Sequence, residues 1–147
     1  MIIRELCTDD YKTVYGFIVN EMEHAEVKFT DMSASLDIMK ADARYFLYVA
    51  EHNNQVVGFV NAVKLHGCID YSYIEITCLV VSQSYQKMGI GKLLLEHIES
   101  LGRENNIEKF SITSGLHRKG AHAFYEKNGY QRGGYAFYNG LEILKKD

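Results

Sequence analysis

Two glycines separated by one residue follow a run of apolar β-forming residues, and this spacing is typical of an anion-binding loop. Gly89 and Gly91 come after the stretch Tyr73–Val81 and precede a helical pattern. Glycine lets the backbone approach an anion closely, and the unpaired N–H groups and positive dipole end of a following helix stabilise negative charge. Lys87 and Lys92 add cations beside the glycines. The segment therefore predicts a phosphate-binding site.

Two better-known glycine loops do not fit this segment. A Walker loop requires glycine where Gln86 stands, and Ser or Thr after Lys92, where Leu93 stands. The dinucleotide fingerprint fails at its third glycine, where Leu94 stands. The pattern that remains is Q-x-x-G-x-G, ending at Gly91.

The elements that must position the loop are predicted from the period of the apolar residues. Leu79–Val81 ends the preceding strand and is apolar on both faces, which indicates a central strand. After Gly89 the period becomes that of an amphipathic helix. The positions on its apolar face are Ile90, Leu93, Leu94, His97, Ile98 and Leu101.

The rest of the chain alternates between strand and helix patterns. Thr8 and Asp9 are candidate caps for the first helix, and Asn53-Asn54 is a candidate hairpin turn. We expect a mixed α/β fold with a mostly antiparallel sheet of six to seven strands and about four helices on its faces. The expected elements are strand 2–4, helix 8–22, helix 31–43, a hairpin over 44–65, strand 71–81, helix 89–101, strand 109–113, helix 119–127 and final strands in 130–144.

Composition limits the possible partners. A chain of 147 residues is expected to form a single domain, residues 1–147, and a net charge of −3 makes nucleic acid an unexpected partner. The N-terminus has neither a signal peptide nor a membrane-span pattern, so we expect a cytosolic protein without a membrane partner. Cys7, Cys68 and Cys78 lack CxxC spacing and the histidines lack an HExxH pair, so no metal site is expected.

The glycine pattern resembles motif A of the GNAT superfamily of N-acetyltransferases, in which (Q/R)-x-x-G-x-(G/A) holds the pyrophosphate of acetyl-CoA. A second segment, Ala121–Tyr130, is similar to the family's helix that carries Phe-Tyr and is followed by a Gly-aromatic turn. The expected order of elements agrees along nearly the whole chain. Two departures are Gln86 in place of the commoner arginine and Ser82-Gln83 where many relatives have Asp-Pro.

The resemblance implies acetyl-CoA as the acyl donor, used in direct attack by an amine without a covalent enzyme intermediate. It assigns stabilisation of the oxyanion to the N–H of Leu79 and protonation of the departing thiolate to Tyr125. For Tyr125 the other interpretation is a core aromatic, although Phe124 is the better candidate for packing. The residues placed against acetyl-CoA are Leu79, Val80, Val81, Gln86, Lys87, Met88, Gly89, Ile90, Gly91, Lys92 and Phe124.

Glu75 is the candidate catalytic base. Its distance in sequence from Gly89 equals that of the base-bearing glutamate in histone-type members of the superfamily. Strand alternation places it on one face with Thr77, Leu79 and Val81. Burial would raise its pKa toward the working range. An ordinary surface glutamate explains the residue equally well.

The acceptor is expected to be a primary amine of a small molecule or a peptide. An acidic run between the first two helices would attract a cationic amine, although a solvated helix end explains it equally well. We expect Cys78 to alternate away from Glu75 and to be packed, and His97 to be a satisfied residue at the edge of the helix's packed face. The acidic residues are Glu21, Glu23, Glu26 and Asp31.

Two other functions stay open. The chain fits a non-catalytic acyl-CoA-binding or sensing module that keeps the glycine loop, or a structural α/β domain with an incidental glycine turn. Retention of Glu75 and Tyr125 favours the enzyme. Near the C-terminus, Tyr135, Phe137 and Tyr138 are candidates for a homodimer surface or for the core.

Overall fold

The computed structural model describes residues 1–140 and contains two compact units. The first unit spans Met1–Ser111, and the second begins at Ile112. The first unit contains the sheet apart from Ile112 at the end of the last strand, the glycine loop and three of the four described α-helices. Most of the candidate functional residues therefore belong to the first unit.

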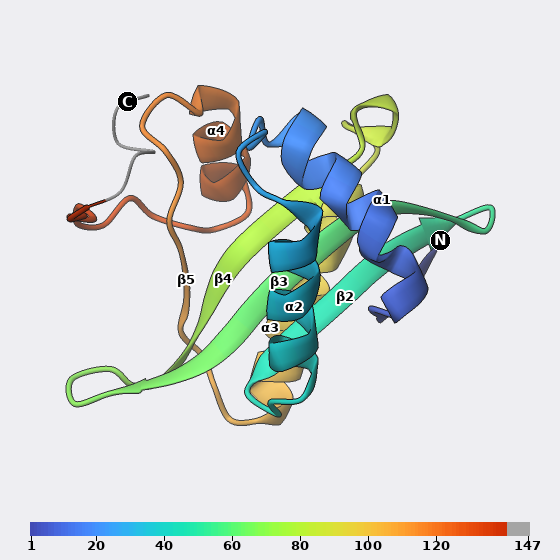
Figure 1. Ribbon diagram of the computed structural model, residues 1–147. Coiled ribbons are helices and arrows are strands. Elements are labelled where there is room, and N and C mark those ends of the chain that lie inside the picture. Colours follow the sequence, from blue (N-terminus) through green and yellow to red (C-terminus); the bar gives the residue numbers. More distant parts are fainter. Residues whose placement is uncertain (141–147) are drawn as a thin grey trace. The chain divides into compact units, whose positions relative to one another are not determined.

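A five-stranded sheet forms the centre of the first unit (Figure 1). Its strands lie in chain order, and the three pairings from β1 to β4 are antiparallel. Among the described residues the sheet thus has fewer strands than the expected six to seven. The strands are β1 (Ile2–Glu5), β2 (Tyr45–His52), β3 (Gln55–Gly67), β4 (Tyr71–Val81) and β5 (Phe110–Ile112).

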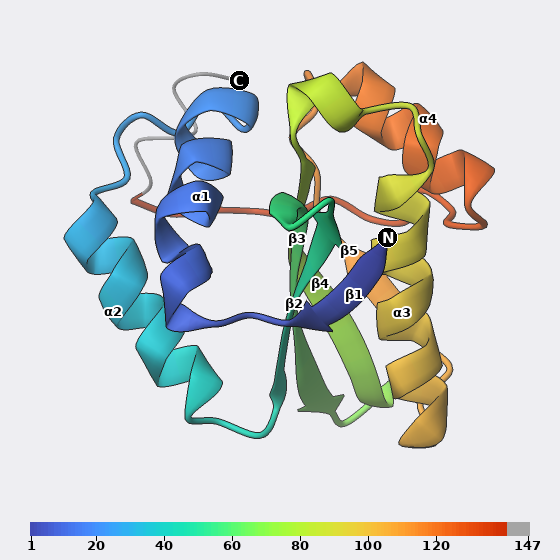
Figure 2. The ribbon, with the colours of Figure 1, turned by 90° about the vertical axis from the view of Figure 1, so that its right-hand side faces the viewer.

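Helices cover both faces of this sheet (Figure 2). One face carries α1 (Tyr11–Gly16) and α2 (Phe29–Lys40), and the other carries α3 (Ile90–Glu104). The hydroxyl of Tyr11 joins α1 to α2 by donating to Asp37 at 2.7 Å. Burial and this hydrogen bond raise the pKa of Tyr11 to about 12.

The first helical segment is less regular than its sequence predicts. A 3₁₀ turn at Thr8–Asp10 precedes α1, and a π-helical turn at Phe17–Glu21 follows it. The carboxylate of Asp10, rather than Thr8 or Asp9, accepts the N–H of Cys7 at 2.8 Å at the start of this segment. The cap prediction was therefore wrong by one or two residues.

The hydrophobic core has two parts, one on each face of the sheet. On the α3 face, Gly58 lies within 3.3 Å of Ile90 and Leu94, measured from the position of an ideal Cβ. This distance shows that α3 approaches the backbone of β3 closely. The core on the α1 and α2 face consists of Leu6, Tyr11, Val14, Phe17, Leu36, Leu47, Val49, Phe59 and Val80.

Gly102 allows α3 to pack closely against its neighbours, and we expect Gly102→Ala to destabilise the fold. A Cβ there would lie 2.6 Å from the ring of Phe110 and 3.0 Å from Ile74. Overpacking costs about 1–3 kcal/mol, and the better helix propensity of alanine offsets about 1 kcal/mol of this. Urea unfolding should therefore give a loss of about 1 kcal/mol.

Gly16→Ala is the matched control for this substitution. Gly16 has helical dihedral angles, and the nearest atom to its ideal Cβ is 4.0 Å away. Alanine should leave the free energy of unfolding unchanged or raise it by up to about 1 kcal/mol. Equal losses in the two variants would contradict the packing explanation for Gly102.

The hairpin between β2 and β3 confirms the turn prediction. Asn53 and Asn54 both adopt positive φ, 50° and 62°, the conformation of a two-residue hairpin turn. The expected final strands are not confirmed, since residues 130–140 contain no strand and residues 141–144 lie outside the described part. Either turn proposed there, Gly133-Gly134 or Asn139-Gly140, consequently joins no described strands.

The second unit contains α4 (Lys119–Lys127), whose bounds agree with the prediction. The side chain of Asn128 closes the helix by donating to the carbonyl of Phe124 at 2.8 Å. Gly129 then adopts a φ of 93°, which favours glycine. Helix α4 thus ends at the predicted Asn-Gly pair.

Candidate functional site

The glycine loop ends at the N-terminus of α3, as the sequence predicts. Gly89 is the N-cap residue, and its φ of 81° favours glycine. No atom of the described residues lies within 4 Å of an ideal Cβ on Gly89, so these residues leave the space above it open. The first N–H groups of a helix have no acceptor within it. This end of α3 can therefore receive an anion.

The loop residues before Gly89 are exposed and are tied to the end of β4. Gln86 donates from Nε2 to the carbonyl of Val81 at 3.1 Å. Lys87 adopts a φ of 65°, and Lys87 and Met88 are exposed. Lys92 lies 3.8 Å from Glu96, and an exposed pair of this kind contributes little. Both lysines can thus turn toward a bound anion.

A β-bulge at Thr77 changes which face each residue of β4 occupies. Ala62 pairs with Ile76 and Asn61 pairs with Cys78, so Thr77 is an extra residue in β4. Because Ala62 and Asn61 point to opposite faces, Ile76 and Cys78 do so too. The hydroxyl of Thr77 donates to the carbonyl of Asn61 at 3.1 Å.

This bulge corrects the predicted placement of Glu75. Glu75 lies on the α1 and α2 face together with Cys78, whereas Leu79 and Val81 lie on the α3 face. The expectations that Glu75 shares a face with Leu79, and that Cys78 alternates away from Glu75, were wrong because simple alternation stops at the bulge. The expectation that Cys78 is packed is confirmed, since it packs against the core on its face.

The edge of β4 near Leu79 extends past its neighbouring strand. Strand β5 has three residues and β4 has eleven, and Ile74 donates to the carbonyl of Lys109 at 3.0 Å. Because Lys109 lies beside Ile74 and β5 ends three residues later at Ile112, β5 stops short of Leu79. Among the described strands, none pairs with that edge at Leu79.

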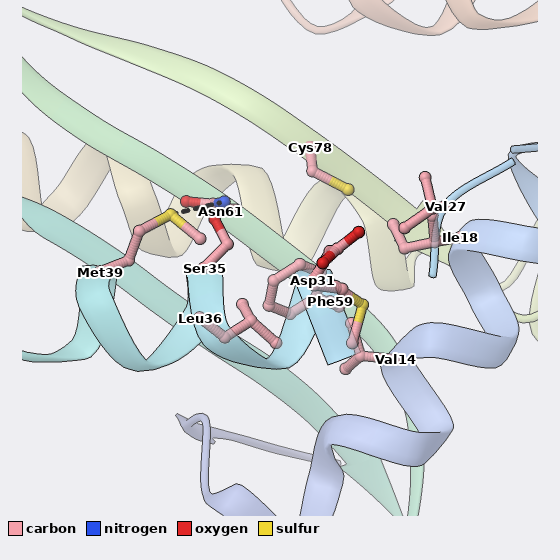
Figure 3. A pocket seen from close by; sticks show the side chains of 11 residues that line it. Val14, Ile18, Val27, Asp31, Ser35, Leu36, Met39, Phe59, Asn61 and Cys78 are labelled. Carbon is pink, nitrogen blue, oxygen red and sulfur yellow. Dashed lines mark hydrogen bonds between the residues drawn. The ribbon is translucent and has the colours of Figure 1, made fainter. Parts of the chain in front are cut away.

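A pocket of about 350 Å³ lies between the sheet and helices α1 and α2 (Figure 3). Cys78 forms part of its wall, so the pocket is one residue along β4 from Leu79. The apolar lining residues include Val14, Ile18, Leu36 and Phe59, and the polar ones are Asp31, Ser35 and Asn61.

The four acidic residues of the first helical region do not act together. Asp31 lines the pocket described above, whereas Glu21 and Glu23 line a smaller, polar pocket of about 240 Å³ beside Gln86. The Oε1 atom of Glu26 lies 2.8 Å from Nδ1 of His24, which is the distance of a hydrogen bond or, with a protonated histidine, of an ion pair. Asp31 is thus the member of the run that reaches the apolar pocket.

Phe124 and Tyr125 lie on α4, in the second unit. Their rings contact each other edge-on with centroids 5.4 Å apart, and the ring of Tyr125 lies 6.2 Å from that of Tyr130. The roles of Phe124 beside the cofactor and of Tyr125 as the acid stay predictions.

His97 differs from its expected state as a satisfied residue. Its ring packs edge-on against Tyr48 on β2, with centroids 4.4 Å apart. The Nε2 atom is buried and has no hydrogen-bond partner among the described residues. Burial lowers the pKa of His97, although Glu104 opposes this shift.

We expect this histidine to make the fold sensitive to acid. The unfolded chain protonates His97 near pH 6.5, while the folded chain resists protonation until a lower pH. The free energy of unfolding should therefore fall as the pH drops below about 6.5. Denaturant titrations of His97→Leu should show a weaker fall over this interval than the parent. His66→Leu, at an exposed position, should retain the slope of the parent.

Sequence reasoning missed Asn61 and the pocket around it. Asn61 is a polar residue within the apolar stretch of β3, and this interruption was the available signal. Its Oδ1 atom is buried and has no partner among residues 1–140. The bulge that turns Cys78 toward the pocket has no comparable signal in the sequence.

Comparisons with known proteins agree with this architecture. The model of the Acetyltransferase (GNAT) family matches residues 5–130. An aminoalkylphosphonate N-acetyltransferase of Salmonella typhimurium is 28% identical over 144 residues, which cover 95% of this chain and 90% of that protein.

Two solved structures share the fold at low sequence identity. A transcriptional regulator from Bacillus halodurans superposes with a TM-score of 0.88 at 16% identity, covering 95% of this chain and 99% of that one. The aminoglycoside acetyltransferase meta-AAC0020, from an uncultured soil metagenomic sample, has a TM-score of 0.81 at 20% identity, with 96% of each chain covered.

The chain belongs to the GNAT family of acetyltransferases, and it is an acetyl-transferring enzyme. The fold prediction is confirmed apart from the strand count. Within residues 1–140, no group of three or more His, Cys, Asp or Glu side chains is arranged to hold a metal ion. The described helices include none that is long and apolar enough to cross a membrane.

Proposed function

We propose that this protein transfers an acetyl group from acetyl-CoA to a primary amine by direct attack in a ternary complex. One observation carries the proposal: the anion-receiving end of α3 and the pocket beside Cys78 both lie near the C-terminal end of β4, on opposite faces of the sheet. A donor held at the loop and an acceptor held in the pocket would then react beside Leu79.

The donor side consists of the glycine loop and the end of β4. The space above Gly89, the N–H groups of Ile90 and Gly91, which have no acceptor within the helix, and the nearby lysines suit a pyrophosphate. Acetyl-CoA supplies an activated thioester there. Leu79, Val80 and Val81 would align the rest of the donor along the free edge of β4. Gln86 and Met88 would border it, and Phe124 keeps its proposed contact.

On the acceptor side, Glu75 is proposed to remove a proton from the amine. Glu75 is half-buried and shares a face with Cys78, three residues away along β4. Three residues of a strand span about 10 Å, so the proton would pass to Glu75 through water rather than directly. The neutral nitrogen can then form its bond to the thioester carbon.

Two groups would stabilise the negative charge that develops during transfer. The N–H of Leu79 donates to the carbonyl oxygen of the acetyl group as this oxygen becomes negative. When the carbon–sulfur bond breaks, Tyr125 gives its proton to the sulfur, and its phenolate then takes up the proton that the acylated nitrogen loses as the amide forms. Both assignments follow the resemblance of Leu79 and Tyr125 to the corresponding family positions.

A thermal-shift titration followed by an assay of thiol release tests this function. Saturating acetyl-CoA should raise the melting temperature of the parent, because a ligand at a hundred times its Kd stabilises by about 2.7 kcal/mol. Gly89→Val should reduce the shift, since valine at a φ of 81° is strained. Thiol should then appear only when a suitable amine is added.

Two outcomes would count against the proposal. A parent protein without any acetyl-CoA shift would contradict the donor site. A normal shift without thiol release, over amines that include apolar, phosphonate-bearing and polycationic types, would favour the acyl-CoA-binding or sensing module.

We also propose a cytosolic location, no nucleic-acid or membrane partner, and a homodimer. The exposed thiols of Cys7 and Cys68 suit a reducing compartment. Tyr135 and Phe137 are 83% and 92% exposed, which suits an interface better than the core. Sedimentation velocity of Phe137→Asp beside the parent would test the dimer.

A further inference from the structure

The pocket beside Cys78 has a chemical character that limits the amine it can accept. Most of its lining is apolar, with Val14, Ile18 and Phe59 among the walls. Its ionisable lining residues are Asp31 and Cys78, and among residues 1–140 no Lys, Arg or His lines it. Such a wall favours an apolar body and leaves an anionic group without a counter-charge.

Asn61 places an unused hydrogen-bond acceptor at the sheet side of this pocket. Its Nδ2 atom contacts the sulfur of Met39 at 3.4 Å, whereas its buried Oδ1 has no partner among the described residues. A buried acceptor without a donor is costly. Because Asn61 pairs with Cys78 across the strands, a donor that reaches Oδ1 would lie close to Leu79.

Asp31 places a negative charge at the solvent side of the same pocket. It is exposed and lies at the start of α2, while Asn61 belongs to β3 on the opposite wall (Figure 3). A carboxylate in this position attracts a cationic amine and repels a phosphonate or carboxylate. Asn61 and Asp31 therefore both favour a ligand that carries a cationic amine.

The size of the pocket favours a compact ligand. Its volume of about 350 Å³ is near the lower end of the range for small-molecule sites. This volume equals that of about twelve water molecules at ~30 Å³ each. An amine of about ten non-hydrogen atoms fits, whereas an aminoglycoside with several sugar rings exceeds this space.

We infer that the acceptor is a compact primary amine with an apolar body and no anionic group, recognised by Asn61 and Asp31. In this arrangement Asn61 Oδ1 accepts an N–H of the amine, and Asp31 attracts its positive charge. The apolar body lies against Val14, Ile18 and Phe59. The inference rests on the proposed function and differs from the substrates for which the Salmonella typhimurium and soil-metagenome relatives are named.

A panel of acceptors tests the class of substrate. The assay measures thiol release from acetyl-CoA with 2-phenylethylamine, 3-methylbutylamine, 2-aminoethylphosphonate, β-alanine and sisomicin. We expect kcat/KM for the two apolar amines to exceed that for the others by about tenfold or more, a range typical of apolar pockets. Faster turnover of 2-aminoethylphosphonate or sisomicin would overturn the inference and leave the proposed function intact.

Asn61→Leu should raise the stability of the protein and lower its activity toward the amine, so the two effects can be measured separately. Removal of the buried acceptor should raise the melting temperature, because leucine fills a similar space without an unsatisfied oxygen. The same change should lower kcat/KM for 2-phenylethylamine about tenfold, while the KM for acetyl-CoA stays unchanged. Unchanged amine kinetics in a folded Asn61→Leu protein would overturn the role of Asn61.

Asp31→Asn tests the contribution of charge. The KM for 2-phenylethylamine should rise about fivefold, and the salt dependence of kcat/KM should weaken. Glu108→Gln is the matched control, because Glu108 is exposed and does not line the pocket. Equal effects of the two variants would overturn the specific role of Asp31.

A binding measurement separates this inference from the proposed function. If no amine releases thiol from acetyl-CoA, the proposed acetyl transfer is contradicted. The ligand class of the pocket is then tested by thermal shifts with 2-phenylethylamine in the absence of acetyl-CoA. A shift in the parent that is lost in Asn61→Leu supports the pocket's ligand class. No shift in the parent overturns it.

Discussion

Glu75→Gln should lower kcat at neutral pH about a hundredfold and leave the affinity for acetyl-CoA unchanged. General-base catalysis contributes about 10²–10⁴-fold to a rate, and water between Glu75 and the amine places the loss at the lower end of this range. Glutamine keeps the shape of the side chain and removes the group that accepts the proton. The effect should therefore appear in kcat and not in the thermal shift with acetyl-CoA.

The pH dependence of the rate distinguishes a base from a structural residue. The pH–rate profile of the parent should have an acidic limb that the variant lacks. Glu99→Gln on α3 is a control of the same chemistry outside the pocket lining. Superimposable pH–rate profiles for Glu75→Gln and the parent would remove Glu75 from the mechanism and favour a base supplied by water alone.

Tyr125→Phe should lower kcat about tenfold to a hundredfold, because the departing thiolate then lacks a nearby acid. The ring contacts with Phe124 and Tyr130 remain possible in the variant, since phenylalanine keeps the aromatic ring. Acetyl-CoA binding should therefore change little. Single-turnover measurement of thiol release would report this step separately from product release.

A change of leaving group identifies the step on which Tyr125 acts. An acetyl thioester of a more acidic thiol needs less protonation, so it should partly restore the rate of Tyr125→Phe but not that of Glu75→Gln. Tyr135→Phe, at an exposed position of the second unit, controls for the loss of a phenol. Full turnover by Tyr125→Phe with acetyl-CoA would end the assignment.

Local patterns were sufficient for the elements nearest the glycine loop. The bounds of β4 and α4 agree with the sequence, and α3 begins directly after Gly89. These segments have clear signals, namely an apolar run, a helical period and Asn-Gly or Gly-x-Gly boundaries. The position of Gly89 at the helix N-terminus was therefore predictable without knowledge of the tertiary structure.

The pocket on the α1 and α2 face was not predictable in the same way. Thr77 is a β-former in a β-forming run, so nothing local indicates that it is an extra residue in the ladder. A bulge depends on the partner strand, and this dependence is why Glu75 and Cys78 were assigned to different faces. The pocket around Asn61 likewise forms only when α1 and α2 cover the sheet.

The extra residue at Thr77 also has a consequence for how this enzyme can diversify. Glu75, Cys78 and Val80 lie on the α1 and α2 face, while Leu79 and Val81 lie on the α3 face, although all five are close neighbours in one strand. Under the proposed function, substitutions of Cys78 in the pocket wall should alter the choice of amine, and they leave the packing on the α3 face undisturbed. A deletion of Thr77 would give a regular ladder and leave both sets on their present faces, because Ile76 and Cys78 already point to opposite faces.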